Sequence, residues 1–586
     1  MTAFNHPDHF DVAVIGGGHA GCEAALAAAR LGARTLLLTQ DLDTVAQMSC
    51  NPSIGGVGKG QLVREIDALG GAMARTADHS MLCGHMLNTS KGAAVRSGRA
   101  QCDKKMYQFA MKATLEVQPG LLLVQDEAAE ILTKSGRACG VRTTRNTVYR
   151  AKTVVITAGT FLRGIIHIGL DSFPGGRYNH PPSGQLSANL KELGFKLGRM
   201  KTGTPMRLNA RGIDFDKCER QAPDSPPEPF SHFTTAIKNP QLPCWITRTN
   251  ARTAAIINRS LHRSPLYSGK IKSTGPRYCP SIEDKVVKFP HHGEHHLFLE
   301  PEGFDTAEYY VNGLSTSLPE ETQIEIVRSV PGLERAEIMR AGYAIEYDYS
   351  DPGQLDYTLE TRVVPGLFTA GQVNGTTGYE EAAAQGLVAG INAARLALGG
   401  QPLVLRRDEA YIGVMIDDLV SKGVDEPYRI FTSRAEYRLL LRQDNADLRL
   451  APRGFALGLL PPSLKDNFEA YRLAVQTLKD GGKPHKVQGG PWTLEKARAE
   501  AAIEKTYGIY VERNRREAEK MKRIDMLRIP ADFSYAAIKA LPNEARHKLE
   551  KNRPLTLAQA GRIPGVTPAD VQLLWILLEK RRGGKK

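Results

Sequence analysis

Residues 11–39 read DVAVIGGGHAGCEAALAAARLGARTLLLT. Two apolar runs rich in β-branched or leucine residues, at 11–17 and 33–39, flank a helical pattern of small residues at 19–31. This order predicts a strand–helix–strand unit and places Gly16, Gly18 and Gly21 at GxGxxG spacing in its first turn. Glycines there let backbone N–H groups and the helix N-terminus approach a pyrophosphate closely. The unit therefore predicts a dinucleotide site.

Later segments indicate which dinucleotide to expect. An NAD-binding unit usually has an acidic residue at the end of its second strand, whereas this chain has Thr39, Gln40 and a late Asp41. Residues 153–160 add a strand that ends in small residues, and residues 366–395 add a strand, a Gly/Thr/Asn turn and an Ala-rich helix. In flavoproteins with two dinucleotide sites, such a late unit closes back on the first. We therefore predict FAD.

A second glycine-rich segment, SCNPSIGGVGKG at 49–60, has the look of a phosphate loop. It is not a Walker A motif, because Ser53 stands where that motif needs glycine and Gly60 stands where it needs Ser or Thr. We interpret it as a backbone-rich loop that lines the flavin pocket, with Cys50 at its mouth.

The region from about 206 to 339 differs in character and is interpreted as a domain inserted into the flavin fold. Within it, residues 275–289 read GPRYCPSIEDKVVKF, and Cys279 lies between Arg277 and Lys285. Nearby positive charge can lower a thiol pKa and so favour the reactive thiolate. A purely structural thiol is the alternative, since Cys139 and Cys218 also have basic neighbours.

Composition is that of a soluble globular protein of three to five domains: 586 residues, 41% hydrophobic and 24% charged. No apolar run is long enough for a membrane helix. The N-terminus shows no signal for export, and eight scattered cysteines without a CxxC pair indicate a reducing cytoplasm. His291, His292, His295 and His296 suggest a surface loop more than a metal site, so we expect no metal.

Positive charge is concentrated in the C-terminal third. The net charge is +14, and residues 401–586 hold 35 Lys and Arg against 24 Asp and Glu. Such an excess favours a polyanionic partner, and nucleic acid is favoured over general solubility. Within 425–449, Arg434, Arg438 and Arg442 would align on one face of a helix, with aromatic residues between them. The alternative is a solvent-exposed face with salt bridges.

Several motifs together closely resemble the MnmG (GidA) family of tRNA wobble-uridine modifying flavoenzymes. They are GGGHAGCEAALAAARLG, MSCNPSIGGVGKG, GPRYCPSIEDKV, GYAIEYD, AGQVNGTTGYEEAAAQGL and FTSRAEYRLLLR, which span nearly the whole chain. The resemblance implies an α/β fold: an FAD-binding, glutathione-reductase-like Rossmann domain with two dinucleotide sites, an inserted α/β domain and a C-terminal all-helical domain. We predict the FAD domain at 1–205 and 340–400, the inserted NADH-binding domain at 206–339, and the helical domain for tRNA and its partner at 401–586.

The resemblance also implies an activity and its partners. Such enzymes bind FAD, accept hydride from NADH and work with the GTPase MnmE. They add an aminomethyl or carboxymethylaminomethyl group to carbon 5 of the wobble uridine, using methylene-tetrahydrofolate and ammonium or glycine. We therefore expect a cytoplasmic homodimer that forms a heterotetramer with MnmE, binds the anticodon region of tRNA and does not bind membranes. The C-terminal segment from about 510 is expected to dock the GTPase.

Site residues follow from the same resemblance. FAD contacts are expected from Gly16, Gly17, Gly18, His19, Ala20, Gly21, Ala128, Ser183 and Gln372; the family often has Val at the position of Ala128, so that contact would be through the backbone. NAD contacts are expected from Gly275, Pro276, Arg277, Tyr278, Cys279, Pro280, Ser281, Ile282, Glu283, Asp284, Lys285, Val286, Val287, Lys288 and Phe289. Cys50 or Cys279 is the expected catalytic thiol, and Arg434, Arg438 and Arg442 are the expected tRNA contacts.

Three other functions remain to be weighed. A folate- and FAD-dependent tRNA uridine methyltransferase shares the flavin domain but lacks a long C-terminal helical part, whereas this chain continues well beyond residue 400. A small-molecule FAD–NADH oxidoreductase would leave the basic C-terminal third unexplained. A non-catalytic RNA-binding scaffold would have no use for the cofactor loops.

Overall fold

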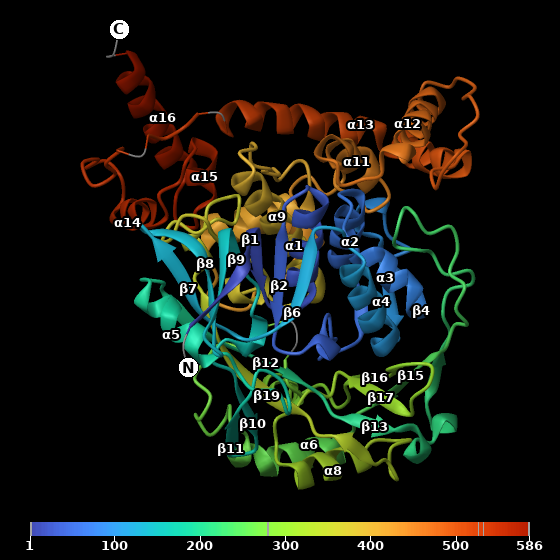
Figure 1. The fold of residues 1–586 in the computed structure, drawn as a ribbon. Helices are drawn as coiled ribbons and strands as arrows, with labels where there is room; N and C mark the ends of the chain where they lie inside the picture. The colour runs from blue at the N-terminus through green and yellow to red at the C-terminus, as the bar shows by residue number, and fades with distance from the viewer. Residues whose placement is uncertain (1–2, 278–279, 526, 531, 584–586) are drawn as a thin grey trace.

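The computed structural model describes residues 3–277, 280–525, 527–530 and 532–583 (Figure 1). Its centre is a sheet in the order β6-β2-β1-β9-β8-β7, with β20 also paired to β9. The strands are β1 Phe4–Ile15, β2 Thr35–Thr39, β6 Leu121–Gln125, β7 Ala128–Lys134, β8 Arg137–Thr143, β9 Thr147–Ile156 and β20 Leu367–Thr369. Strands β6, β2, β1, β9 and β20 run parallel, as a dinucleotide-binding sheet requires.

Two helices far apart in the sequence pack directly against each other beside this sheet. Helix α1 spans His19–Arg30 and helix α9 spans Tyr379–Ala397. A Cβ atom on Gly386 would lie 2.0 Å from the carbonyl oxygen of Ala20, and one on Gly390 would lie 2.2 Å from that of Ala24. The small residues of both helices therefore allow the two backbones to approach closely. This contact joins the late strand–turn–helix unit to the first strand–helix–strand unit.

The glycine-rich loop leads into a small subassembly on the flank of the sheet. It consists of the sheet β3-β5-β4 and three helices. The elements are β3 Ser53–Gly55, α2 Lys59–Ala68, α3 Met73–His79, β4 Met81–Leu87, β5 Ser97–Cys102 and α4 Lys104–Glu116. Their apolar side chains belong to the same core as α1 and α9, so this part packs onto the dinucleotide unit.

Two further sheets lie at the lower end of the molecule in Figure 1. The first, β11-β10-β19-β12, contains β10 Ile165–Ile168, β11 Asp171–Pro174, β12 Leu197–Thr204 and β19 Tyr343–Ser350, and α5 Gly184–Glu192 packs on β7. The second, β14-β15-β16-β17-β13-β18, contains β13 Arg207–Asn209, β14 Glu219–Gln221, β15 Cys244–Arg248, β16 His296–Pro301, β17 Glu308–Asn312 and β18 Ile338–Arg340. Helices α6 Ala251–Ser260, α7 Ile282–Lys288 and α8 Glu320–Arg328 contribute to the core beneath the second sheet.

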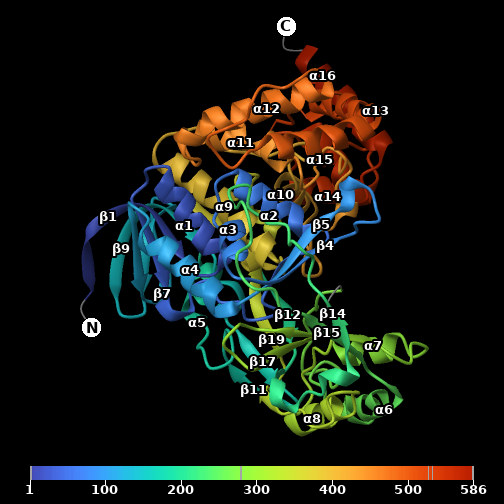
Figure 2. The same cartoon turned by 90° about the vertical axis from the view of Figure 1, so that its right-hand side faces the viewer.

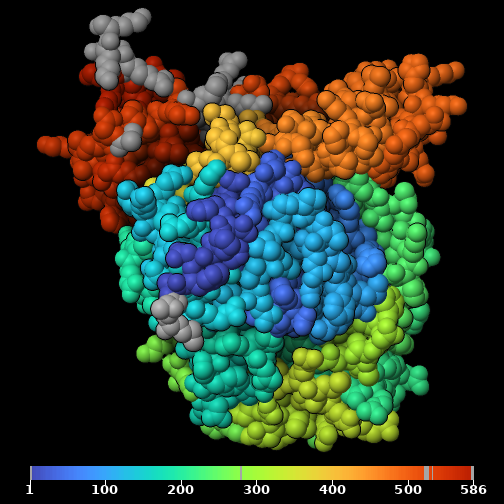
Figure 3. All heavy atoms as spheres, in the orientation of Figure 1, coloured from blue at the N-terminus to red at the C-terminus, as the bar shows by residue number. Residues whose placement is uncertain are grey.

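Helices dominate the chain after residue 400 and cap the opposite end of the molecule (Figures 2 and 3). They are α10 Tyr411–Lys422, α11 Ala446–Leu457, α12 Lys465–Lys479, α13 Leu494–Asp525, α14 Asn543–Asn552, α15 Leu557–Arg562 and α16 Pro568–Gly583. The predicted fold class is confirmed: a parallel dinucleotide sheet, a mixed α/β part and a C-terminal helical part.

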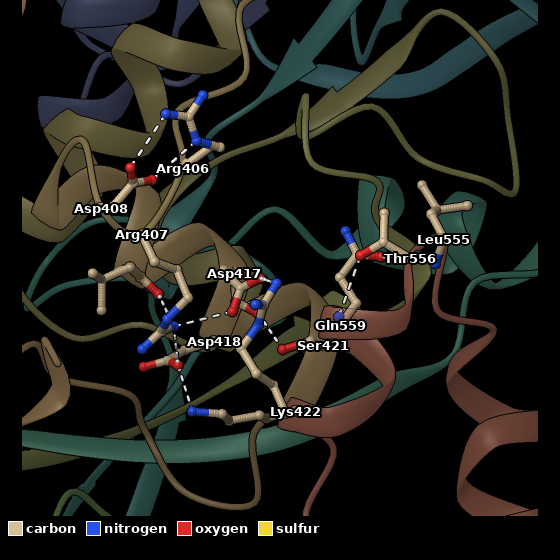
Figure 4. Close-up of polar contacts among 12 residues, drawn as sticks. Arg406, Arg407, Asp408, Asp417, Asp418, Ser421, Lys422, Leu555, Thr556 and Gln559 are labelled. Carbon is tan, nitrogen blue, oxygen red and sulfur yellow. Dashed lines mark hydrogen bonds and ion pairs between the residues drawn. The ribbon is translucent and has the colours of Figure 1, made fainter. Parts of the chain in front are cut away.

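The last helices are tied to the core through a charged contact with α10. Arg562 of α15 donates to Asp417 at 2.8 Å. Arg407 donates to both Asp417 and Asp418 on α10, at 3.0 and 2.7 Å, and Lys422 also donates to Asp418 (Figure 4). The C-terminal helices are therefore joined to α10 by ion pairs, while their apolar side chains form a small core of their own.

In the part of the chain that the structure describes, no helix is both long enough and apolar enough to cross a bilayer.

Candidate functional site

A cavity of about 480 Å³ opens where the strands of the central sheet end. Residues that directly follow β1, β2 and β9 line it, together with residues from the loop after β20 and from the loop that leads into β3. In open parallel sheets, ligands bind at this carboxyl edge. The topology alone therefore marks this cavity as the candidate site.

The walls of the cavity suit a bound pyrophosphate. Helix α1 begins here without a side-chain cap, so its first N–H groups are free to meet an anion. A Cβ atom on Gly16 would lie 2.8 Å from the carbonyl oxygen of Thr157, whereas one on Gly18 would meet no protein atom within 4 Å. Gly16 is thus required by the protein's own packing, and Gly18 leaves open space on the cavity side.

The cavity brings together most of the positions predicted to contact FAD. Eight of the nine line it: Gly16, Gly17, Gly18, His19, Ala20, Ala128, Ser183 and Gln372. Gly21 is not in the lining; a Cβ atom there would lie 1.7 Å from the carbonyl oxygen of Gly16, so this glycine allows the turn itself to close. Asp41 also lines the cavity, and its carboxylate caps the short turn Leu42–Thr44 by accepting from the N–H of Asp43.

His19 is buried at the start of α1 and stacks on Tyr379, with 4.5 Å between ring centroids. Burial lowers the pKa of His19 to about 4, although Glu380 acts in the opposite direction. The imidazole is therefore neutral at physiological pH. Its Nε2 atom has no hydrogen-bond partner among the described residues, so a polar group of a bound ligand could satisfy it.

The loop that carries Cys50 reaches the cavity from the side, as predicted. The Cys50 N–H donates to the hydroxyl oxygen of Tyr379 at 2.8 Å, and the Cys50 sulfur lies 3.0 Å from the hydroxyl of Tyr310. Tyr379 begins α9, while Tyr310 lies on β17 of the inserted region. The thiol is half-buried and lines the cavity, so it is held in place yet open to a substrate.

Arg207 fixes the same loop from behind. Its guanidinium donates to the carbonyl oxygens of Ser49 and Cys50, at 2.9 and 3.3 Å, and lies over the ring of Tyr310. Glu302 accepts from it at 2.9 Å. Burial of the guanidinium acts to lower its pKa, but the charge and hydrogen bond of Glu302, together with its other neighbours, raise the pKa overall, so Arg207 stays protonated. Cys50 therefore lies beside a permanent positive charge.

A buried ion triad joins the glycine-rich loop to α9. Lys59 lies 2.8 Å from Glu380 and 3.1 Å from Glu381, and all three side chains are buried. Burial disfavours the charged lysine, but the two carboxylates outweigh it and raise the Lys59 pKa. Glu380 also accepts from the N–H of Gly55 at 2.7 Å. These contacts hold the glycine-rich loop against α9, whose first residues line the cavity.

The segment predicted to bind NAD lies mostly away from the cavity. Pro276 lines it, and the exposed Arg277 pairs with Glu426 at 3.1 Å. Ile282 and Val286 are in the apolar core of the inserted region. The buried Glu283 accepts from Thr316. The side chains of these last three residues are therefore buried within the inserted region, and the NAD contacts expected from this segment stay a prediction.

Two residues of this segment, Tyr278 and Cys279, lie outside the described residues. The catalytic role of Cys279 therefore stays a prediction. Among the residues that are described, no group of three or more His, Cys, Asp or Glu side chains is arranged to hold a metal ion.

The predicted helix with three aligned arginines is wrong. Residues 432–434 form one 3-10 turn, and no regular helix begins until Ala446. Arg442 is fully buried and pairs with Glu500 and Glu504 of α13, at 2.6 and 2.8 Å. Arg434 lies over the ring of Tyr428, and only Arg438 is exposed. Arg442 is thus an internal ion-pair partner and cannot reach tRNA phosphates.

Replacing Arg442 with methionine is expected to destabilise the protein by about 3 kcal/mol, because it leaves the buried Glu500 without its cationic partner. Arg438→Met removes an equal charge from an exposed site and should change stability by less than about 0.5 kcal/mol. Denaturant unfolding of both variants measures the difference. Equal stability of the two variants would contradict the burial argument.

Comparison with known proteins gives a consistent result. The family model described as "Glucose inhibited division protein A" matches residues 11–401. The chain belongs to the GidA family. A second model, the tRNA modifying enzyme MnmG/GidA C-terminal helical bundle, matches residues 517–586, so the GidA resemblance extends into the helical end of the chain.

Individual GidA relatives match over nearly the whole length. A protein of Syntrophotalea carbinolica named tRNA uridine 5-carboxymethylaminomethyl modification enzyme MnmG is 51% identical, over 97% of this chain and 99% of its own. A protein of Geobacillus kaustophilus with the same name is 50% identical, over 98% of each chain. The crystal structure of Aquifex aeolicus GidA, form I, superposes with a TM-score of 0.90 at 50% identity, covering 97% of this chain and 100% of that one.

Sequence reasoning missed several residues of this GidA-family site. Tyr310 and Arg207 lie on short strands of the inserted region, where no local pattern distinguishes them from ordinary strand residues. Tyr379, Glu380 and Glu381 follow the glycine-rich turn directly, so their position at the helix N-terminus could have been found from the sequence. Lys59 would have been the natural partner to seek for those two carboxylates.

Proposed function

We propose that this chain is an FAD-dependent enzyme that modifies carbon 5 of the wobble uridine in tRNA, installing an aminomethyl or carboxymethylaminomethyl group. The observation that carries the proposal is the combination of near-complete similarity to proteins named for this activity with a cavity that gathers the predicted FAD contacts. The match of the C-terminal bundle weighs against the methyltransferase alternative, which lacks that part.

The cofactor site fits FAD through the uncapped N-terminus of α1, the open space at Gly18 and the unpaired Nε2 of His19. When bound, FAD would supply hydride transfer and a carrier for the one-carbon unit. NADH is the proposed hydride donor. Of the residues predicted to contact it, Pro276 lines the cavity. Methylene-tetrahydrofolate is the proposed carbon donor, and ammonium or glycine the amine.

Cys50 is the proposed nucleophile. A thiolate that adds to carbon 6 of a uridine makes carbon 5 nucleophilic, so carbon 5 can form the new carbon–carbon bond. Loss of the carbon 5 proton together with the thiolate then restores the double bond of the ring. The hydrogen bonds of Tyr379 and Tyr310 orient the Cys50 backbone and sulfur, and Arg207 holds the loop by its carbonyls. Cys279 belongs to the same proposal only through the family resemblance.

The tRNA is proposed to bind through the basic C-terminal third, with its anticodon reaching the cavity. Arg438 is the exposed candidate for a phosphate contact, and Arg434 is the half-buried one. If six to ten such phosphate contacts form, raising the salt concentration from about 50 to 200 mM should weaken tRNA binding about 1,000-fold or more.

Arg438→Gln is expected to lower by about one the slope of the logarithm of the affinity against the logarithm of the salt concentration. Electrophoretic titrations at several salt concentrations measure this slope. A salt-independent affinity would contradict a phosphate interface.

The partner is proposed to be the GTPase MnmE, docked on the helices after residue 510, in a heterotetramer formed by a homodimer of this chain in the cytoplasm. The compact core of α14, α15 and α16 supports a separate docking module. Deletion of residues 540–586 should remove the association and leave FAD-loaded protein.

The decisive test compares wobble nucleosides from cells with and without the gene. Digestion of total tRNA and mass spectrometry should show loss of the aminomethyl and carboxymethylaminomethyl uridines when the gene is deleted. Restoration by the wild-type gene attributes the change to this protein. Unchanged wobble nucleosides would overturn the proposed function.

A further inference from the structure

Two cysteines far apart in the sequence meet where the flavin domain touches the inserted region. Cys83 lies on β4, and Cys244 is the first residue of β15; both side chains are buried. The two segments are joined by backbone contacts: Leu242 donates to the carbonyl of Leu82 at 2.7 Å, and Gly84 donates to the side chain of Gln241 at 3.0 Å. The two side chains are close enough to affect each other: the contact lowers the pKa of Cys83 and raises that of Cys244.

A histidine and an aspartate complete the cluster. The Nε2 atom of His85 lies 3.3 Å from the Cys83 sulfur, and its Nδ1 atom lies 3.5 Å from a carboxylate oxygen of Asp224. Asp224 is held in place because its other oxygen accepts from the N–H of Met86 at 2.6 Å. Thiol, imidazole and carboxylate are thus aligned in the order in which a base activates a nucleophile.

The charges around Cys83 favour its thiolate. A hydrogen bond from the Cys244 thiol, followed by His85 and the guanidinium of Arg99, lowers the Cys83 pKa against the effect of burial. The contact with Cys83 and the Asp224 carboxylate raise the pKa of His85, also against burial. Other buried thiols behave oppositely: burial raises the pKa of Cys22 and of Cys102. Cys83 is thus set apart by its neighbours.

We propose that Cys83 and Cys244 are a redox-active dithiol that hydrogen peroxide converts to a disulfide. The Cys83 thiolate attacks one oxygen of the peroxide; the O–O bond breaks, and the leaving hydroxide takes a proton from His85 to become water. The Cys244 sulfur then attacks the resulting sulfenic acid; the S–O bond breaks, the S–S bond forms, and hydroxide leaves with the Cys244 proton as a second water. Each sulfur loses one electron, and the peroxide gains two.

The cluster lies one layer below the surface. The His85 side chain is 13% exposed and that of Asp224 is 43% exposed, whereas both sulfurs are covered. An oxidant nearly as small as water can pass such a cover, but a bulky disulfide reagent cannot. This favours peroxide over exchange with glutathione disulfide as the oxidising reaction.

The disulfide would lie close to the Cys50 loop. Arg99 pairs with Glu300 at 2.5 Å, and Glu300 also accepts from Asn51, next to Cys50, at 2.6 Å. Arg99 lies opposite His85 on β5, and Leu299, next to Glu300 on β16, lies opposite Trp245, next to Cys244. A covalent bond between Cys83 and Cys244 would therefore link the sheet that carries Arg99 to the sheet that carries Glu300.

The test exposes the purified full-length protein to hydrogen peroxide, blocks free thiols, and maps peptides without reduction. A linked pair of Cys83 and Cys244 peptides, two hydrogens lighter than their sum and released by dithiothreitol, is expected. Cys218, half-buried with a pKa raised by burial and by Asp214, is the internal control and should react more slowly. Absence of the linked pair, or equal oxidation of Cys218, would overturn the proposal.

Two matched variants test the role of His85. His85→Gln removes the proton donor beside Cys83 and should slow disulfide formation roughly tenfold. His79→Gln changes an exposed histidine nearby and should leave the rate unchanged. Equal rates in both variants would contradict activation by His85. Because these experiments need no tRNA, their failure is separate from failure of the proposed function.

Discussion

Cys50→Ser is expected to reduce tRNA modification about 1,000-fold or more while the protein remains folded and yellow with FAD. A serine hydroxyl is far less acidic than a thiol, and the nearest groups to Cys50 are two tyrosine hydroxyls and a backbone carbonyl, none of which is a base strong enough to ionise it. The substitution is nearly isosteric and keeps the backbone contact with Tyr379. Single-turnover modification of an unmodified tRNA transcript measures the effect.

A matched control separates loss of the nucleophile from loss of any thiol. Cys139 on β8 is also half-buried but lies outside the cavity lining, so Cys139→Ser should retain full activity. Tyr310→Phe removes only the hydroxyl 3.0 Å from the Cys50 sulfur. It should give an intermediate loss of activity, because it disturbs the orientation of the thiol but leaves the thiol in place. Full activity of Cys50→Ser with normal FAD content would eliminate the covalent role.

Gly18→Val is expected to weaken FAD binding by at least about 1,000-fold, or about 4 kcal/mol, with the fold intact. A Cβ atom at Gly18 meets no protein atom within 4 Å, and the residue is in an extended conformation, φ −77° and ψ −176°, that valine adopts readily. The added methyl groups would instead occupy the space that a pyrophosphate needs in order to reach the first N–H groups of α1. Flavin fluorescence titration of apoprotein measures the affinity.

The matched control is Gly508→Val on α13, another glycine whose added Cβ atom would meet nothing within 4 Å but which is remote from the cavity. It should bind FAD as the wild type does. Thermal unfolding of both apoproteins shows whether either substitution has disturbed the fold. A Gly18→Val protein that is equally stable and still binds FAD tightly would refute the cofactor site.

Local patterns predicted the flavin unit well because its signals are local. The glycines at 16–21 lie in one turn, and a Cβ atom on Gly17 or Gly21 would first meet atoms of the same unit, although one on Gly16 would meet Thr157 after β9. The strand, turn and helix around 366–395 were predicted on similar grounds, although the strand β20 is only three residues long. The predicted loop at 49–60 also lines the cavity.

The arginine prediction failed because its outcome depends on distant residues. Spacing of four residues places side chains on one face only if the backbone is helical, and residues 435–445 form no regular helix. The carboxylates that bury Arg442 lie on α13, about 60 residues later, and no periodicity near Arg442 points to them. Tyr310 was missed for the same reason, because its contact with Cys50 joins residues 260 positions apart.

The backbone contact between α1 and α9 bears on how the chain matures during synthesis. Gly386 and Gly390 let α9 pack closely on α1, which lies within the first thirty residues. Residues of both helices line the cavity, so the cavity is complete only when both helices are present. A ribosome-bound chain that has not yet delivered residues 379–397 lacks one side of the cofactor cleft. Flavin capture is therefore expected only after residues 379–397 have emerged, when about two-thirds of the chain has been made and the intervening sheets have had time to fold.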